Sequence, residues 1–158
     1  QAGGQQIAYV EIVSIMSQYT YWKEVTKIMK AKEANISKTL NGKQQQLQQA
    51  AANFQQNVQA NKYTQAQAQQ IQASIQKQAQ DAEALQQRLG AEYQNEVAKY
   101  NKALADSVHN YLAQFNKDKK YAMILAKSGD NILYADKSLD ITNEVVKGMN
   151  KAYKGMKK

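Results

Sequence analysis

Apolar side chains recur at spacings of three and four along most of the chain. Leu40, Leu47 and Phe54 stand seven residues apart, which is the heptad spacing that packs helices into a coiled coil. The pattern predicts one long helix that ends near Ala60 and another that follows it. The apolar positions of this predicted seam are Val25, Ile28, Met29, Ile36, Leu40, Leu47, Phe54, Val58, Ile71, Ile75, Ala82, Leu85, Leu89, Val97, Tyr100, Leu104, Val108, Tyr111 and Phe115.

The two long helices are predicted to fold back on each other at Asn61–Thr64, where the sequence reads NKYT. Thr64 and Gln67 match a capping box, in which the hydroxyl and the amide satisfy N–H groups at a helix start. Antiparallel folding about this tip brings the apolar positions of both halves together. The predicted pairs are Phe54 with Ile71, Leu40 with Leu85, Ile36 with Leu89, Ile28 with Val97, and Val25 with Tyr100.

Both ends of the chain carry β-type patterns. Ile7–Val10 reads as a strand, and a short helix follows from about Ile12 and ends near Tyr19–Tyr21. The segments YAMILAK and ILYAD, joined by SGDN, predict a β-hairpin over 121–136, because Gly129 and Asn131 tolerate positive φ. Asp140 is the predicted cap of a final helix. The apolar face of that helix consists of Ile141, Val145, Met149 and Tyr153.

An isolated two-stranded hairpin is marginal in water, so we expect it to pair with the N-terminal strand. The fold class is therefore α+β, mostly α, with a long antiparallel helical-hairpin (coiled-coil) tentacle on a small β body. The N-terminal strand and the C-terminal β-hairpin form that body. The predicted domains are 1–18 with 119–158 for the body and its C-terminal helix, and 19–118 for the tentacle. Three strands leave two bare edges, which invite a partner chain.

The net charge of +8 is unevenly placed along the chain. Between positions 44 and 87, Lys62 and Lys77 are balanced by Asp81 and Glu83, so this glutamine-rich stretch is neutral. The excess positive charge therefore lies outside the distal tentacle. It is compatible with an acidic polypeptide, an anionic membrane surface or nucleic acid as partner, and charge alone does not choose among them.

Residue types that carry catalysis or bind metals are sparse. The chain has no Cys, and His109 is its only His, which argues against a transition-metal site. His109 follows Val108 of the predicted seam and reads as a residue of a helix face. The SGDN turn lacks the glycine spacing and lysine of a phosphate loop. We predict no enzyme activity, no cofactor and no metal.

The order of strand, long helical hairpin, β-hairpin and capped helix resembles the Skp/OmpH family of bacterial periplasmic chaperones. The residues that carry the resemblance are IAYVE at Ile7–Glu11 and ILAKSGDNILYADKSLDITNEVVKGMN at Ile124–Asn150, above all LYAD and LDIT. The resemblance implies a homotrimer whose strands close on one another and whose tentacles surround a cavity for unfolded outer-membrane proteins. Family tentacles carry many charges, whereas this distal tentacle is neutral.

Two sets of site residues follow from this interpretation. For client binding, the aromatic residues near the first helix break and the basic residues of the body and tentacle base are candidates. This set comprises Tyr19, Tyr21, Trp22, Lys23, Lys27, Lys99, Lys102, Lys119 and Lys120. The aromatic members could equally pack the hairpin root onto the body, and the lysines could be a solvated helix face. The predicted trimerisation residues are Ile7, Tyr9, Val10, Ile124, Leu125, Ile132, Leu133 and Tyr134.

Three functions compete at this point. The first is an ATP-independent holdase chaperone that binds unfolded outer-membrane proteins in the periplasm. The second is a passive coiled-coil scaffold or spacer of the cell envelope. Nucleic-acid binding is the weakest, because no recognised nucleic-acid motif accompanies the basic residues. The sequence begins QAGGQQ without Met, which is compatible with a processed, periplasmic chain or with a lipid anchor on a preceding residue.

Overall fold

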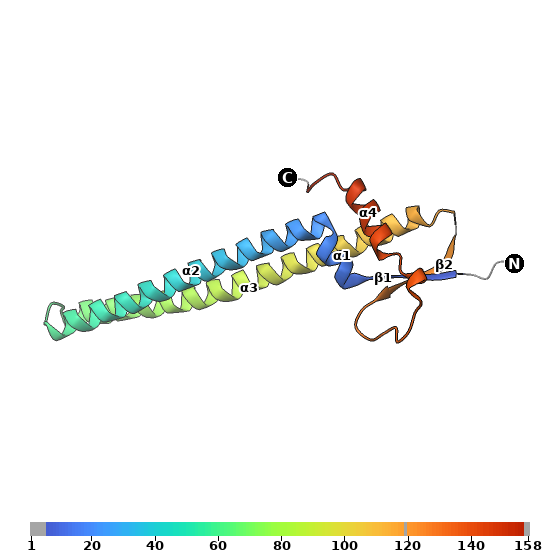
Figure 1. The fold of residues 1–158 in the computed structure, drawn as a ribbon. Helices are drawn as coiled ribbons and strands as arrows, with labels where there is room; N and C mark the ends of the chain where they lie inside the picture. The colour runs from blue at the N-terminus through green and yellow to red at the C-terminus, as the bar shows by residue number, and fades with distance from the viewer. Residues whose placement is uncertain (1–5, 119, 157–158) are drawn as a thin grey trace. The chain divides into compact units, whose positions relative to one another are not determined.

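The structure is a computed structural model that describes residues 6–118 and 120–156. Figure 1 shows its two long helices and the small sheet. The elements are β1 (Gln6–Glu11), α1 (Ile12–Gln18), α2 (Thr20–Gln59), α3 (Gln65–Phe115), β2 (Tyr121–Lys127), the 3₁₀ helix η1 (Lys137–Leu139) and α4 (Thr142–Ala152). The predicted N-terminal strand, the helix break near Tyr19 and both long helices are confirmed.

The chain divides into two compact units. The sheet unit comprises Gln1–Ile28 and Lys99–Lys158, and the arm unit comprises Met29–Ala98. The predicted domains, 1–18 with 119–158 and 19–118, stay a prediction, because a compact unit of contacts need not fold as an independent domain.

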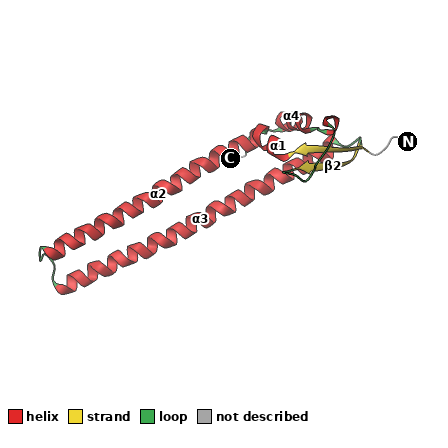
Figure 2. Cartoon of the chain, turned by 60° about the horizontal axis from the view of Figure 1, so that its bottom comes forward, coloured by secondary structure: helices red, strands yellow, loops and turns green. Residues whose placement is uncertain are grey.

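The sheet of the sheet unit has two parallel strands, which Figure 2 shows side by side. Ala8 pairs with Ile124 and Val10 with Ala126. β-Branched and aromatic residues favour these extended segments, and alternation turns Ala8 and Val10 toward the core. The core around them consists of Ala8, Val10, Ile15, Tyr19, Leu104, Val108, Tyr121, Ile141, Val145, Val146 and Met149.

The predicted β-hairpin is wrong in its second half. Residues 132–136 form no strand, and β2 pairs with β1 instead of with a returning segment. The side-chain amide of Asn131 explains the difference, because its N–H donates to the Ala126 carbonyl at 2.8 Å and its oxygen accepts from the Ser128 N–H at 2.9 Å. These bonds close the turn, in which Gly129 has a φ of 61°. They also occupy a carbonyl that a returning strand would need.

The second edge of β1 is covered within the chain. The Ile141 N–H donates to the Tyr9 carbonyl at 3.0 Å, and the Glu11 N–H donates to the Thr142 hydroxyl at 2.8 Å. Of the two bare sheet edges that were predicted, only the outer edge of β2 therefore remains open among the described residues.

Helix α4 begins at Thr142, one residue later than a cap at Asp140 requires. The Asp140 carboxylate nevertheless accepts the Thr142 N–H at 2.9 Å, so it satisfies one of the N–H groups that the helix start leaves without a partner. The predicted apolar face is confirmed for Ile141, Val145 and Met149, which are buried, whereas Tyr153 follows the last residue of α4 and is half-buried.

The arm unit folds back where the sequence predicts. The Thr64 hydroxyl accepts the Gln67 N–H at 3.1 Å, and the Gln67 side chain accepts the Thr64 N–H at 3.0 Å. Asn61 turns the chain with a φ of 55°. The ring of Tyr63 stacks on Phe54 at 6.2 Å between centroids. The capping box and the tip at Asn61–Thr64 are therefore confirmed.

Contacts across the arms agree with the predicted pairing. Lys32 of α2 forms an ion pair with Glu96 of α3, and the Tyr93 hydroxyl lies 3.4 Å from a Glu33 carboxylate oxygen. Both contacts lie within one helical turn of the pairing that the tip predicts. Only Met29 is buried in the arm unit, at 8% exposure, while seam residues such as Leu47 and Leu85 stay half-buried.

Candidate functional site

The outer edge of β2 is the one sheet edge that the described chain leaves open. In a strand, the N–H and C=O of one residue point to the same side and alternate along the chain. Tyr9 and Glu11 direct their backbone groups to the 140–142 segment, so Ala8 and Val10 face β2. The parallel register then directs the backbone groups of Ala122, Ile124 and Ala126 outward. Among them, the Ala126 carbonyl is taken by Asn131.

Apolar side chains surround this edge. On the face of the sheet, Ile7 is 45% exposed, and its β2 partner Met123 is 52% exposed. Beyond the strand, Leu133 and Tyr134 are 92% and 85% exposed. An open edge beside apolar side chains is a template for another chain.

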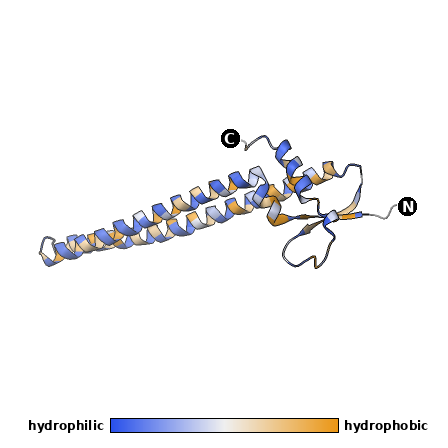
Figure 3. Ribbon diagram, viewed as in Figure 1, coloured by the Kyte–Doolittle hydropathy of each residue, from blue (hydrophilic) through white to orange (hydrophobic). Residues whose placement is uncertain are grey.

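An apolar groove of about 220 Å³ lies under the inner face of the same sheet. Helices α1 and α3 and both strands line it, with Met16, Ala105, Leu112 and Leu125 among the lining residues. Figure 3 shows the strands coloured mainly as hydrophobic. The groove and the open edge share β2, because Ile124 and Ala126 line the groove and direct their backbone groups to the edge.

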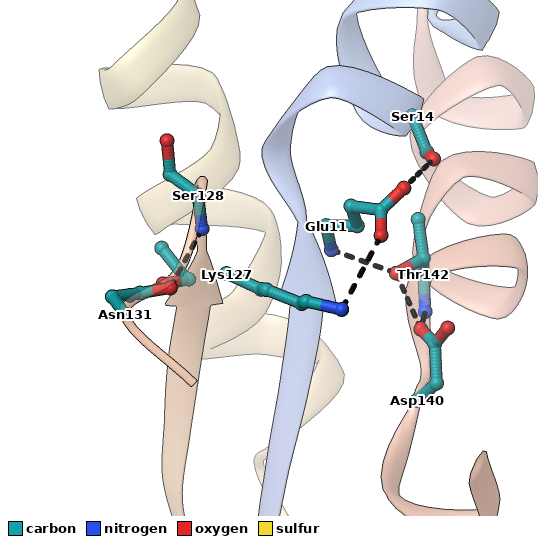
Figure 4. A network of polar contacts seen from close by, with 8 residues as sticks. Glu11, Ser14, Lys127, Ser128, Asn131, Asp140 and Thr142 are labelled. Carbon is teal, nitrogen blue, oxygen red and sulfur yellow. Dashed lines mark hydrogen bonds and ion pairs between the residues drawn. The ribbon is translucent and has the colours of Figure 1, made fainter. Parts of the chain in front are cut away.

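A polar network fixes the end of β2 against β1 and α4, as Figure 4 shows. The Glu11 carboxylate accepts the Ser14 hydroxyl at 2.6 Å and lies 3.9 Å from the Lys127 ammonium. The Glu11 N–H reaches Thr142, which is itself bonded to Asp140. The network ties the two strand ends and the start of α4 together, so the direction in which the 128–136 loop leaves the sheet is set.

The arm unit presents a different kind of surface. Two open grooves of about 720 and 440 Å³ flank the seam, and Lys43, Leu47 and Ala82 line both. Ala82 has a small side chain, so apolar seam atoms stay accessible in the grooves that it lines together with Leu47. Such a surface offers apolar contacts together with uncharged hydrogen-bond donors and acceptors.

The described residues offer neither a metal site nor a membrane span. No group of three or more His, Cys, Asp or Glu residues there is arranged to hold a metal ion. Across the same residues, no helix combines the length and the apolarity that crossing a membrane requires.

Comparison with known proteins identifies the family. The model of a family described as outer membrane protein (OmpH-like) matches residues 6–149. The chain belongs to this OmpH-like family. No curated protein matches it. A crystal structure of an OmpH-like outer membrane chaperone from Caulobacter crescentus has the same fold, with a TM-score of 0.86 and 16% identity, covering 100% of this chain and 91% of that one.

In this OmpH-like chain, the predicted client-binding aromatic residues lie against the core of the sheet unit. Tyr19 is buried, and Tyr21 and Trp22 are half-buried beside it. The ring of Tyr153 contacts Tyr19 and Tyr21 edge-on, with centroids 6.0 and 5.8 Å away. Burial raises the pKa of Tyr19, against a hydrogen bond with Ser107 that lowers it. Burial also raises the pKa of Tyr21.

The predicted client-binding lysines of the OmpH-like chain are exposed wherever they are described. Lys23, Lys27 and Lys99 face solvent. Lys102 pairs with Asp106 at 2.9 Å, and the Lys120 ammonium lies 5.4 Å from the ring centroid of Tyr121. Lys119 lies outside the described residues. All of these positions belong to the sheet unit.

The structure separates the predicted trimerisation residues into two groups. Tyr9 and Val10 are buried within the chain, and Ile124 and Ile132 are half-buried. The exposed members are Ile7, Leu125, Leu133 and Tyr134. Sequence reasoning missed Met123, which alternation with Leu125 could have found. It expected Gly129 and Asn131 to take positive φ in the turn, but of the two only Gly129 does, and Asn131 contributes its side-chain amide instead.

Proposed function

We propose that this OmpH-like chain is an ATP-independent holdase chaperone that binds unfolded outer-membrane proteins in the periplasm as a homotrimer. The family match over most of the chain supports a chaperone role. The Caulobacter crescentus structure of the same fold, which is named an outer membrane chaperone, supports the same class of function.

The surface of the arm unit is the observation that carries the proposal for client binding. Its seam leaves Leu47 and Leu85 half-buried in open grooves, flanked by Gln46 and Gln78. An unfolded barrel protein exposes apolar side chains and unpaired backbone groups, and this surface offers partners for both. Contacts of this kind are individually weak and accept many sequences, as a holdase requires.

The open edge of β2 supports the proposal of a homotrimer. A single chain leaves outward backbone groups at Ala122 and Ile124, next to the exposed side chain of Met123. A closed assembly of identical copies covers such an edge without inviting further growth. Assembly would also gather several arm units into one binding surface, which raises the affinity for a long client through multivalency.

Capture and holding should depend on different forces. The exposed lysines of the sheet unit steer an acidic client, and steering weakens as salt shortens the Debye length from about 10 Å at 0.1 M to about 3 Å at 1 M. The apolar contacts in the arm grooves persist at high salt. We therefore expect salt to slow capture markedly and to leave the bound complex intact.

Stopped-flow capture of an unfolded outer-membrane protein across salt concentrations tests this mechanism. The replacement of Lys99, Lys102, Lys119 and Lys120 by Gln should slow capture at low salt in the same way as added salt does. A control that removes four charges from the arm unit, at Lys30, Lys38, Lys43 and Lys62, should slow it less. No capture at any salt would overturn the holdase and favour a passive envelope scaffold.

A further inference from the structure

The sheet unit combines an apolar groove with a loop that carries exposed apolar side chains. The groove of about 220 Å³ is lined by apolar residues apart from Asn101 and His109. The loop that follows β2 carries Leu133 and Tyr134, which are 92% and 85% exposed. Exposure this high shows that neither side chain occupies the groove of its own chain. Large side chains held in solvent beside an open sheet edge indicate a partner surface.

The loop is held so that it cannot simply collapse onto its own sheet. Asn131 bonds to Ser128 and to the carbonyl of Ala126, which points away from β1. The bonds anchor the turn at the outer edge of β2, whereas the groove lies under the inner face, between α1 and α3. A copy that docks on the open edge of β2 therefore meets a loop that is already presented to it.

The two surfaces match in chemistry as well as in size. Leu133 is apolar throughout, and Tyr134 combines an apolar ring with one hydroxyl that needs a hydrogen-bond partner when it is buried. The groove offers the same combination, with apolar walls from Met16 and Leu112 and polar side chains at Asn101 and His109. A groove of this volume holds one large side chain with part of a second.

We propose that Leu133 and Tyr134 of one copy insert into the groove of a neighbouring copy. This inference rests on the homotrimer proposed above and names the contact that closes it. In a trimer the contact is head-to-tail, because the loop of each copy enters the groove of the next copy, and a head-to-tail contact that closes on itself forms a ring. The groove is thus completed only by residues of the partner copy.

Disulfide trapping tests the contact directly, because the chain has no natural Cys. One population carries Leu133→Cys and a second, differently tagged population carries Ala105→Cys, at an exposed position that lines the groove. Oxidation of the mixture should link the two tags. A control in which Lys151→Cys on α4 replaces Ala105→Cys should not link, because Lys151 does not line the groove.

Two further variants test the energetics of the ring. Leu133→Ser removes the inserted side chain and should weaken assembly by about tenfold or more, because an interface that loses a buried leucine loses that much affinity. Ala105→Trp fills the groove from its open side and should weaken assembly similarly. Val13→Ser is the matched control, since Val13 is 67% exposed in the same unit and does not line the groove.

An equal mixture of the two variants gives the sharpest result. The Ala105→Trp copy keeps its loop and the Leu133→Ser copy keeps its groove, so one contact forms and the ring cannot close. Native mass measurement should then show heterodimers. Wild-type trimers that tolerate both variants and give no crosslink would overturn the inference and leave the holdase intact. Crosslinking of Ala105→Cys to an added cysteine-bearing client instead of to Leu133→Cys would also overturn it. A monomeric wild type would overturn both proposals.

Discussion

The sheet unit and the arm unit are stabilised in different ways. The sheet unit has a core in which Val145 and Ala8 are 0% exposed and Val10 is 2% exposed. The arm unit buries Met29 to 8% exposure and leaves every other seam residue half-buried or exposed. Tertiary burial therefore stabilises the first unit, whereas helix propensity, the capping box and a thin seam stabilise the second.

Residue size explains this contrast. The sheet unit contributes Tyr, Trp, Ile, Val and Met to its core, whereas the arm seam sets single apolar residues such as Leu47 and Leu85 beside Ala82 and many exposed glutamines. A thin seam costs stability but leaves apolar atoms accessible in grooves that a well-packed coiled coil would close. The region proposed to bind clients is the region that packs least, as expected for surfaces drawn from the low-stability end of a fold.

The largest expected effect comes from a charge in the core of the sheet unit. Val145→Asp buries a carboxyl group where the valine is 0% exposed. We expect a loss of roughly 4 kcal/mol or more in the free energy of unfolding, measured by urea denaturation. Val58→Asp in the arm unit, where Val58 is 42% exposed, should cost about 1 kcal/mol or less. Equal losses at both positions would contradict the difference between the units.

A second comparison makes the same substitution, glycine to alanine, in one helix of each unit. A Cβ added at Gly148 of α4 would lie 1.6 Å from the Tyr111 hydroxyl oxygen, so Tyr111 must move. Gly148→Ala should lower the free energy of unfolding by about 1–3 kcal/mol. A Cβ added at Gly90 of α3 meets no atom within 4 Å. Gly90→Ala should therefore raise the stability of the helix by about 1 kcal/mol. Thermal unfolding followed by circular dichroism measures both changes in stability. Changes of the same sign in the two variants would contradict the expected difference between the units.

Filling the arm seam should reduce the difference in packing between the two units. Ala82→Leu places a larger side chain at a position that lines both arm grooves, as Leu47 does. The added burial should stabilise the arm locally by about 1 kcal/mol and slow hydrogen exchange of nearby amides about fivefold. Ala52→Leu, at an exposed position that lines neither groove, is the control. Faster client release from Ala82→Leu would link the open grooves to holding.

The smallest effect concerns alkaline pH and the sheet unit alone. Burial, followed by the hydrogen bond that the Tyr153 hydroxyl donates to Glu24 at 2.5 Å, raises the pKa of Tyr153 well above its ordinary value of 10.0. The folded state thus favours the neutral phenol. This contribution is complete below pH 10 and is lost as pH rises through the folded-state pKa, because the unfolded chain releases its proton first.

The Tyr153→Phe variant should therefore show a shallower loss of stability than the wild type above pH 10. Urea denaturation at pH 9 and at pH 10.5 measures the difference. Tyr134→Phe is the control, because Tyr134 is 85% exposed and lies outside the aromatic cluster. Parallel pH profiles for Tyr153→Phe and the wild type would show that the Glu24 contact does not hold the phenol neutral.

Local patterns in the sequence determined the arm unit almost completely. Heptad spacing set the two helices, and Thr64 with Gln67 set the tip, because helix periodicity and capping depend on residues a few positions apart. The short strand at Ile7–Val10 and the apolar face of α4 are local in the same sense. Each of these patterns lies within a few neighbouring residues, so it can be recognised from the sequence without knowing any distant contact.

The tertiary structure alone decided how the sheet unit closes. The sequence predicts a hairpin at 121–136, yet β1 pairs with β2 in parallel, and Asn131 takes the carbonyl of Ala126 that a returning strand would use. The cover that Ile141 and Thr142 place on β1, and the groove under β2, join residues more than a hundred positions apart. Strand pairing depends on which distant segment the fold brings next to a strand edge. The periodicity of residues along the chain does not encode that choice.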